Sequence, residues 1–227
     1  FSQILTMSHL PPMGPISDED LIVIYDGGIM IENETIIGVG KFHEIKKECN
    51  NIHEIDFPCV LLPGFIDCHT HICYAGSRSI EYSKKNAGVS YQKILSEGGG
   101  IYDTMEKTRL ASDEELIKNT ISRLERHFFE GVLTCEIKSG YGIDFDQEIR
   151  LLKIINEINT KHPSSVIPTC LAAHVPPNDS KTSTEEYLKL IVKELFPILR
   201  KENLTNRIDV FIENNAFKKE ESKSYLK

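Results

Sequence analysis

Two histidines separated by a single residue, His69 and His71, follow an apolar segment of the chain. Side chains at positions i and i+2 of a β-strand point to the same face, so the two imidazoles would lie side by side at the end of a strand. Neutral imidazole is a good ligand for Zn²⁺ and for Fe²⁺. A pair of hydrogen-bonded histidines lining a loop is the alternative interpretation. The turn and the buried strand predicted just before the pair, at residues 63–67, favour half of a metal site.

Three more polar residues are candidates for the same site. Arg78 ends a loop of small residues, where its planar guanidinium could bind a carboxylate through two parallel hydrogen bonds. Tyr141 stands between two glycines and supplies an uncharged hydroxyl. His174 ends a predicted strand, where it could bind metal, bind substrate or cap the strand. Taken singly, a surface arginine, an ordinary turn and a strand cap are the competing interpretations.

Other motifs give weaker indications. The triple glycine at residues 98–100 lacks the spacing of a phosphate-binding G-x-x-x-x-G-K-[ST] loop. We expect it to end a helix and to let the backbone approach a ligand. The remaining histidines fall in predicted loops or on helix faces and are assigned no role: His9, His43, His53, His127 and His162.

Strands and helices are predicted to alternate after residue 60, which indicates parallel pairing. The predicted strands cover residues 60–67, 132–137, 166–171 and 208–212. One helix begins at Ser112 and ends at Gly131, a second contains the apolar positions 151–158, and a third begins at Ser183 and is kinked or shortened by Pro197. No G-x-G-x-x-G follows the first strand, so a (β/α)8 barrel is favoured over an open dinucleotide-binding sheet. Polar residues end every predicted strand, as in barrel active sites: His69, His71, Lys138, His174 and Glu213.

Residues 1–60 form a small β-rich domain in this interpretation, with hairpin turns at 26–28 and 32–34 and one short helix over 42–49. Residues 61–227 then supply only four predicted strands, whereas a complete barrel needs about 250 residues. The sequence therefore predicts the first half of a barrel, and we expect the chain to be the front portion of a longer protein.

The composition is that of a globular domain, with 40% hydrophobic and 26% charged residues. The net charge of -8 argues against binding to nucleic acid or to an anionic membrane surface. No apolar run approaches a membrane span of about 20 residues. Six cysteines form no C-x-x-C pair, and most lie in apolar, strand-like runs, so we expect reduced core thiols and a cytoplasmic protein.

Taken together, these motifs resemble the imidazolonepropionase family within the amidohydrolase superfamily. The His-x-His element in residues 63–71 marks the superfamily, whereas the more specific stretches are Gly76-Ser77-Arg78, Glu97-Gly98-Gly99-Gly100-Ile101, Glu136-Ile137-Lys138-Ser139-Gly140-Tyr141-Gly142 and Ala172-Ala173-His174-Val175-Pro176-Pro177. The likeness runs from about residue 55 to the end, and the leading strands fit the small composite β-domain of that family.

The resemblance implies one Zn²⁺ or Fe ion per subunit and hydrolysis of the cyclic amide of 4-imidazolone-5-propanoate to N-formimidoyl-L-glutamate in histidine degradation. It makes His69 and His71 metal ligands. It makes Arg78, Tyr141 and His174 substrate-binding residues, and we take His174 as catalytic as well. It also suggests a homodimer that acts on a small molecule.

The family takes a third metal-binding histidine, a nearby glutamate and a later aspartate from strands that residues 1–227 do not contain. Catalytic zinc sites have three protein ligands, so we expect this chain by itself to be inactive. A half barrel also leaves an unpaired sheet edge, which predicts poor solubility of the isolated chain. Another amidohydrolase, such as a deaminase or dihydroorotase, and a non-catalytic paralogue remain as alternatives. The absence of lysine from the predicted strand 208–212 favours one metal over two.

Overall fold

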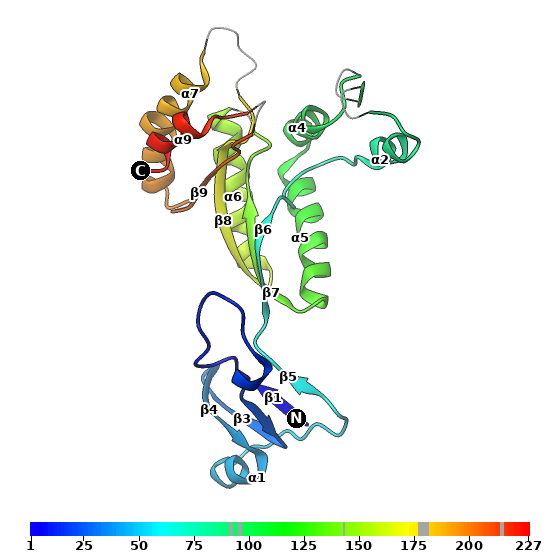
Figure 1. Ribbon diagram of the computed structural model, residues 1–227, viewed down its shortest axis with the longest axis vertical. Helices are drawn as coiled ribbons and strands as arrows, with labels where there is room; N and C mark the ends of the chain where they lie inside the picture. The colour runs from blue at the N-terminus through cyan, green and yellow to red at the C-terminus, as the bar shows by residue number, and fades with distance from the viewer. Residues whose placement is uncertain (91–92, 95–96, 143, 177–181, 214–215) are drawn as a thin grey trace. The chain divides into compact units, whose positions relative to one another are not determined.

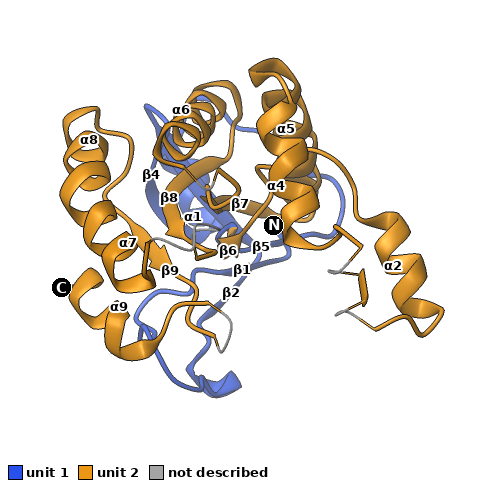
Figure 2. Ribbon diagram, turned by 90° about the horizontal axis from the view of Figure 1, so that it is seen from above, with its two compact units in different colours: residues 1–64 blue, residues 65–227 orange. Residues whose placement is uncertain are grey.

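The computed structural model describes residues 1–90, 93–94, 97–142, 144–176, 182–213 and 216–227. The chain divides into two compact units, residues 1–64 and residues 65–227, shown in separate colours in Figure 2. The division follows Gly64, four residues after the boundary predicted from the sequence. Each unit has its own sheets, as Figure 1 shows, and is described by itself.

The first unit holds two small sheets. Strands β2, β1 and β5 form one sheet in that order, and β3 and β4 form a hairpin. The bounds are β1 Gln3–Leu5, β2 Val23–Tyr25, β3 Gly27–Glu32, β4 Thr35–Lys41, α1 Phe42–Ile45 and β5 Val60–Leu61, with 3-10 turns at Asp18–Asp20 and Lys46–Glu48. Asn33 and Glu34 have φ of 48° and 63°, and positive values at both central residues are typical of a two-residue hairpin turn. The hairpin predicted at residues 32–34 is therefore confirmed.

The hairpin predicted at residues 26–28 is wrong. Tyr25 pairs with Gln3 in one sheet, whereas Gly27 pairs with Lys41 in the other. The chain crosses between the sheets at Asp26, whose amide donates a hydrogen bond to the Ser2 carbonyl. A pattern of apolar runs around a turn does not show which strand each run pairs with. The single helix predicted over 42–49 is likewise replaced by α1 and a separate 3-10 turn.

The second unit is built on a four-stranded parallel sheet in the order β6-β7-β8-β9. All four predicted strands are present, and the predicted parallel pairing is confirmed. The bounds are β6 Phe65–Thr70, α2 Ser79–Asn86, α4 Ile101–Leu110, α5 Asp113–Phe129, β7 Val132–Lys138, α6 Phe145–Lys161, β8 Ser165–Ala173, α7 Thr184–Leu190, α8 Phe196–Lys201, β9 Ile208–Val210 and α9 Lys219–Tyr225. Helices α5 and α6 run alongside the sheet (Figure 1). This arrangement establishes a mixed α/β unit.

The predicted helix starts are confirmed by their caps. Ser112 accepts a hydrogen bond from the Glu115 amide at the start of α5. Ser183 and Glu186 form a reciprocal capping box at the start of α7. The predicted effect of Pro197 is also present, because a π-helical turn at Ile191–Leu195 separates α7 from α8. Proline lacks the amide that would continue the regular helical ladder.

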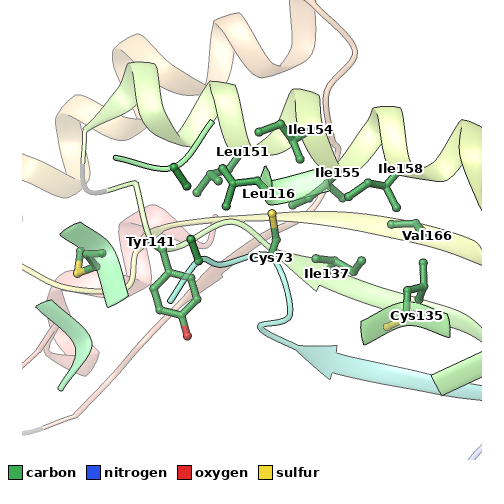
Figure 3. Packing of buried hydrophobic residues seen from close by; sticks show 14 residues of the cluster. Cys73, Leu116, Cys135, Ile137, Tyr141, Leu151, Ile154, Ile155, Ile158 and Val166 are labelled. Carbon is green, nitrogen blue, oxygen red and sulfur yellow. The ribbon is translucent and has the colours of Figure 1, made fainter. Parts of the chain in front are cut away.

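One buried core joins α5 and α6 to β7 and β8. The apolar side of α6 supplies Leu151, Ile155 and Ile158, and Ile137 on β7 meets them (Figure 3). This is the amphipathic pattern predicted from the spacing of residues 151–158. The core fixes the helices on the sheet and so sets the positions of the strand ends.

The prediction that residues 63–67 form a buried strand is wrong in its burial. Phe65 and Ile66 are 55% and 70% exposed, because β6 pairs only with β7 among the described residues. An apolar strand with one neighbour exposes backbone and side chains that a second neighbour would cover. The strand itself, and its end at the histidines, are as predicted.

The cysteines divide into two groups. Cys73, Cys135 and Cys170 are buried, whereas Cys68 is exposed and Cys49 and Cys59 are half-buried, and all six are free thiols. Burial raises the pKa of Cys73 to about 11 and that of Cys170 to about 12. The expectation of core thiols therefore holds for three of the six. None of the helices in the described part of the chain is long and apolar enough to cross a bilayer.

The burial of these thiols predicts graded reactivity toward a thiol reagent at pH 8. The thiolate is the reactive form, so exposed Cys68 is expected to react fastest and the three buried thiols only after unfolding. A timed titration in native buffer and in denaturant measures both classes. Cys68→Ser should remove the fastest phase and Cys73→Ser should leave it unchanged. Rapid reaction of all six thiols in native buffer would contradict the predicted packing.

Candidate metal and substrate site

His69 and His71 meet at the end of β6. Their Nε2 atoms are 3.3 Å apart, and their ring centroids are 5.2 Å apart. The pairing register of β6 with β7 shifts between Asp67 and Thr70, so regular strand alternation is interrupted at this point. The two rings converge, as the spacing in the sequence predicts.

The donor set of this pair fits a metal ion. Two nitrogens about 2.0–2.1 Å from one tetrahedral ion are roughly 3.3 Å apart. Burial, followed by the nearby His174, His69 and Lys138, lowers the pKa of His71 to about 4, so its imidazole is neutral, which is the ligating form. The Nδ1 atom of His71 is buried, and the described residues supply it with no hydrogen-bond partner.

A third ligand is not assembled within the described residues, which contain no group of three or more His, Cys, Asp or Glu side chains able to hold a metal ion. His174 lies near the pair, with its ring centroid 5.2 Å from that of His71. The chain thus presents two converging donors and a third histidine beside them.

The Tyr141 and His174 rings complete a compact aromatic group with His71. The Tyr141 centroid lies 6.2 Å from that of His71 and 5.6 Å from that of His174. Tyr141 is buried at its ring, and its hydroxyl points away from the α6 side chains (Figure 3). Burial raises the pKa of Tyr141, so its hydroxyl stays protonated and can donate a hydrogen bond.

His174 is held in one tautomer by the backbone. Its Nδ1 is 2.7 Å from the Gly140 carbonyl oxygen, which can only accept, so Nδ1 carries the proton. Burial lowers the pKa of His174, although the Gly140 hydrogen bond opposes this shift. The neutral ring therefore has Nε2 as a hydrogen-bond acceptor.

Arg78 reaches the same group of side chains. It immediately precedes α2, and its positive charge lies near enough to Tyr141 to favour the ionised form of that hydroxyl, against the larger effect of burial on its pKa. The segment before it is fixed by Arg123, which donates to the carbonyls of Ile72 and Tyr74 and stacks 3.7 Å from the Tyr74 ring centroid. Arg78 is exposed, so the competing interpretation of a surface arginine stays open beside that of a substrate-binding one. Sequence reasoning missed Arg123, because an arginine on a helix gives no sign of its partners.

The loop that carries Tyr141 is shaped by a buried carboxylate, Glu148, which is 0% exposed. Glu148 accepts hydrogen bonds from the Ser139 hydroxyl and from the amides of Gly140 and Gly142. Burial raises the pKa of Glu148, and these three donors oppose the shift. Gly140 has φ of 78°, and a Cβ there would lie 2.9 Å from His174 Nδ1, which explains the glycine. Nothing in the sequence marked Glu148, since an acidic residue in a helix normally faces solvent.

A second group of charges is linked to Thr70, the residue between the histidines, and its members Lys138 and Glu136 are buried. Lys138 Nζ is 2.6 Å from Glu136 Oε1 and 3.0 Å from Asp209 Oδ2. Burial opposes the charge of Lys138, but its hydrogen bonds to Glu136 and Asp209 outweigh burial and raise its pKa. The other oxygen of Glu136 accepts from the amide of Thr70 at 3.1 Å. Glu136 and Lys138 share one face of an apolar strand, so their spacing was a usable signal for a buried pair.

The triple glycine follows helical residues, as predicted: Lys93 and Ile94 are helical, and their carbonyls accept hydrogen bonds from the amides of Glu97 and Gly99 at 3.1 Å and 3.0 Å. Gly98 and Gly100 have φ of 80° and 78°, and Gly100 directly precedes α4. The Gly100 amide donates to Glu81 Oε1 at 2.7 Å, which ties the start of α4 to α2. Glycine adopts these positive φ values without steric cost, at the end of one helix and just before the next. Pro177 of the predicted His174 motif lies outside the described residues.

The chain is similar in sequence to curated bacterial imidazolonepropionases. The chain is 38% identical over 216 residues to an imidazolonepropionase of Bdellovibrio bacteriovorus, a match covering 93% of this chain and 50% of the relative. It is 35% identical over 231 residues to one of Streptococcus pyogenes serotype M4, covering 100% of this chain and 54% of the relative. An Acinetobacter baumannii imidazolonepropionase is 39% identical over 195 residues, covering 86% and 48%. The chain spans about half the length of these curated relatives. No family model matches it.

Removal of the Glu148 carboxylate should destabilise the second unit strongly. Glu148→Ala leaves three buried donors without their acceptor, at about 1–3 kcal/mol each, so we expect a loss of about 3 kcal/mol or more in the free energy of unfolding. Urea unfolding followed by tyrosine fluorescence measures it, since the chain has no tryptophan. Glu157→Ala on the same helix removes an exposed ion pair with Lys161 and should cost under about 1 kcal/mol. Equal losses in the two variants would refute this role of Glu148.

Proposed function

We propose that the chain, which by its sequence belongs to the imidazolonepropionase family, provides half of the active site of a metal-dependent hydrolase. The reaction proposed for the whole protein is hydrolysis of the cyclic amide of 4-imidazolone-5-propanoate to N-formimidoyl-L-glutamate, a step of histidine degradation. The observation that carries this proposal is the convergence of His69 and His71 beside Arg78, Tyr141 and His174.

His69 and His71 would hold one metal ion, either Zn²⁺ or Fe, since imidazole suits both. Such an ion, when bound, supplies a water whose pKa is lowered to about 7 and polarises the carbonyl under attack. Further ligands are needed for a catalytic site with three protein donors, and the described residues do not assemble them. The second half of the coordination sphere is therefore proposed to come from outside this set of residues.

The substrate side of the site follows from the chemistry of three residues. Arg78 is proposed to pair with the propionate carboxylate, for which its planar guanidinium is suited. The Tyr141 hydroxyl is proposed to donate a hydrogen bond to a ring oxygen or nitrogen. His174 presents Nε2 as an acceptor, which can orient a ring N–H or carry a proton toward the leaving nitrogen when the ring opens.

The architecture proposed for the whole protein is a (β/α)8 barrel with a composite β-sandwich domain. The parallel order β6-β7-β8-β9, with the site residues at the carboxyl ends of the strands, supports this proposal. The exposed apolar side chains of β6 are what a further strand would cover. A cytosolic location accords with free thiols, and a homodimer is the state suggested by the family resemblance.

A deaminase or a two-metal amidohydrolase is less well supported. A nucleobase gives Arg78 no carboxylate to bind. The two-metal type needs a carboxylated lysine on the fourth strand, whereas β9, Ile208–Val210, contains none. The ammonium of Lys138 is already engaged by two carboxylates. Turnover of imidazolone propionate and of nucleobases, compared for the protein made from the complete coding sequence, separates these functions.

Loss of one histidine should remove both metal and activity from that complete protein. We expect His71→Ala to lower the bound metal well below one ion per chain and to abolish ring opening, because the ion loses one of its two ligands from this chain. Metal analysis by mass spectrometry and an absorbance assay of ring opening provide the measurements. His162→Ala serves as the control, because His162 precedes β8 whereas the site residue His174 follows that strand. Undiminished metal and turnover in His71→Ala would overturn the proposed function.

Replacement of Arg78 should weaken substrate binding selectively. Arg78→Met removes the partner of the propionate, and a charge-assisted bidentate interaction of about 1.5–3 kcal/mol corresponds to a rise in KM of roughly 10- to 100-fold. Arg78→Lys keeps the positive charge but lacks the planar guanidinium, so its KM should lie between those of the parent protein and Arg78→Met. Steady-state kinetics with the propionate substrate and with its amide, which lacks the charge, tests the assignment. Equal KM effects on the two substrates would show that Arg78 does not recognise the carboxylate.

A further inference from the structure

A chain of charged hydrogen bonds joins three strands of the sheet and ends at the residue between the two histidines. It begins at Asp209 on β9, passes through Lys138 and Glu136 on β7, and ends at the backbone amide of Thr70 on β6. Its links measure 3.0 Å, 2.6 Å and 3.1 Å in that order. The chain thus connects the outermost strand of the described sheet to the residue that separates His69 from His71.

Thr70 is held at two points by Glu136. Its amide donates to the Glu136 side chain, and its hydroxyl donates to the Glu136 backbone carbonyl at 2.6 Å. The first hydrogen bond holds the peptide that joins His69 to Thr70, and the second holds the Thr70 side chain. Movement of Thr70 would displace both imidazoles, because His69 and His71 are its immediate neighbours in the chain. Glu136 in turn is oriented by Lys138, which holds its other carboxylate oxygen.

The cost of burying these charges indicates a role beyond stability. Lys138 and Glu136 are only 4% and 8% exposed. Buried ion pairs often add little net stability, because each ion loses its hydration. They do fix geometry, and residues that orient metal-binding groups are a recognised use of such contacts. A cavity of about 330 Å³ lies beside these charges. Its lining includes Lys138, Glu136 and Asp209, together with Cys68 and Thr169.

We propose that Lys138 is a positioning residue that holds the His69–His71 pair in its converging geometry through Glu136 and the Thr70 amide. The inference rests on the proposed function, since it assigns this geometry to metal binding. Asp209, on β9, binds the Lys138 ammonium as well and so helps to fix its position. No contact between Lys138 and the substrate is required.

The test is the affinity of the complete, metal-free protein for Co²⁺, with the Co²⁺ absorption spectrum as a second readout. Lys138→Met removes the ammonium and keeps the apolar stem, and we expect Co²⁺ binding about 10- to 100-fold weaker. Asp209→Asn removes the negative charge of a side chain that is 38% exposed and leaves Lys138 and Glu136 in place. We therefore expect a smaller effect, a fall in Co²⁺ affinity of about threefold or more. Both variants should also alter the ligand-field spectrum of the bound ion.

Lys161→Met is the matched control, because it breaks an ion pair of similar length on the exposed side of α6. It should leave the Co²⁺ affinity and spectrum unchanged. Urea unfolding of each metal-free variant separates positioning from stability, since a purely structural lysine would lower the unfolding midpoint and leave the affinity of the folded protein unchanged. Should Lys138→Met not fold, Asp209→Asn alone decides the question.

The outcomes distinguish this inference from its premise. Weakened and spectrally altered Co²⁺ binding in the folded variants supports it. Binding within twofold of the parent protein in Asp209→Asn and in any folded Lys138→Met overturns it, while leaving the metal site intact. Failure of the parent protein itself to bind Co²⁺ through His69 and His71 overturns the proposed function and this inference together.

Discussion

The site depends on the fact that parallel strands bring their carboxyl ends to one edge of a sheet. His69 and His71 at the end of β6, the loop after β7 and His174 after β8 come together for this reason. The core formed by α5, α6 and the inner strands keeps these ends in register. The histidine pair, Tyr141 and His174 are all attached to that edge, so the geometry of the site is set by the packing of the sheet.

Fixed hydrogen bonds then refine the positions of the side chains. Glu148 shapes the loop of Tyr141, and the Gly140 carbonyl in that loop selects the tautomer of His174. Glu136 holds the peptide between the two histidines. Buried polar groups are costly unless they are satisfied, and the carboxylates of Glu148 and Glu136 each accept hydrogen bonds from named donors. The result is a site with little freedom on the side that this chain supplies.

Much of the fold could be predicted from the sequence, because local signals determine it. Caps such as Ser112 and Ser183, and the helical spacing of residues 151–158, depend on near neighbours and were read correctly. The hairpin at 26–28 was predicted wrongly, because pairing depends on residues distant in sequence such as Gln3 and Lys41. The burial of β6 was overestimated for a related reason, since apolar composition does not tell which neighbours a strand has.

The candidate site shows the same division. The histidine pair, Arg78, Tyr141 and His174 were found from motifs, and the structure brings them together. Glu148 and Arg123 were missed, because their roles arise only from contacts across the fold. Glu136 and Lys138 stood at a spacing that indicates a shared face, yet their partner Asp209 on β9 could not be inferred from that spacing.

The central claim is that His69 and His71 bind one metal ion through their imidazoles. X-ray absorption spectroscopy of the metal in the complete protein tests it most directly. The account predicts at least two imidazole ligands at about 2.0–2.1 Å, with one lost in His69→Ala and one in His71→Ala at any metal that remains bound. A spectrum without imidazole scattering, or one that neither substitution changes, would contradict it.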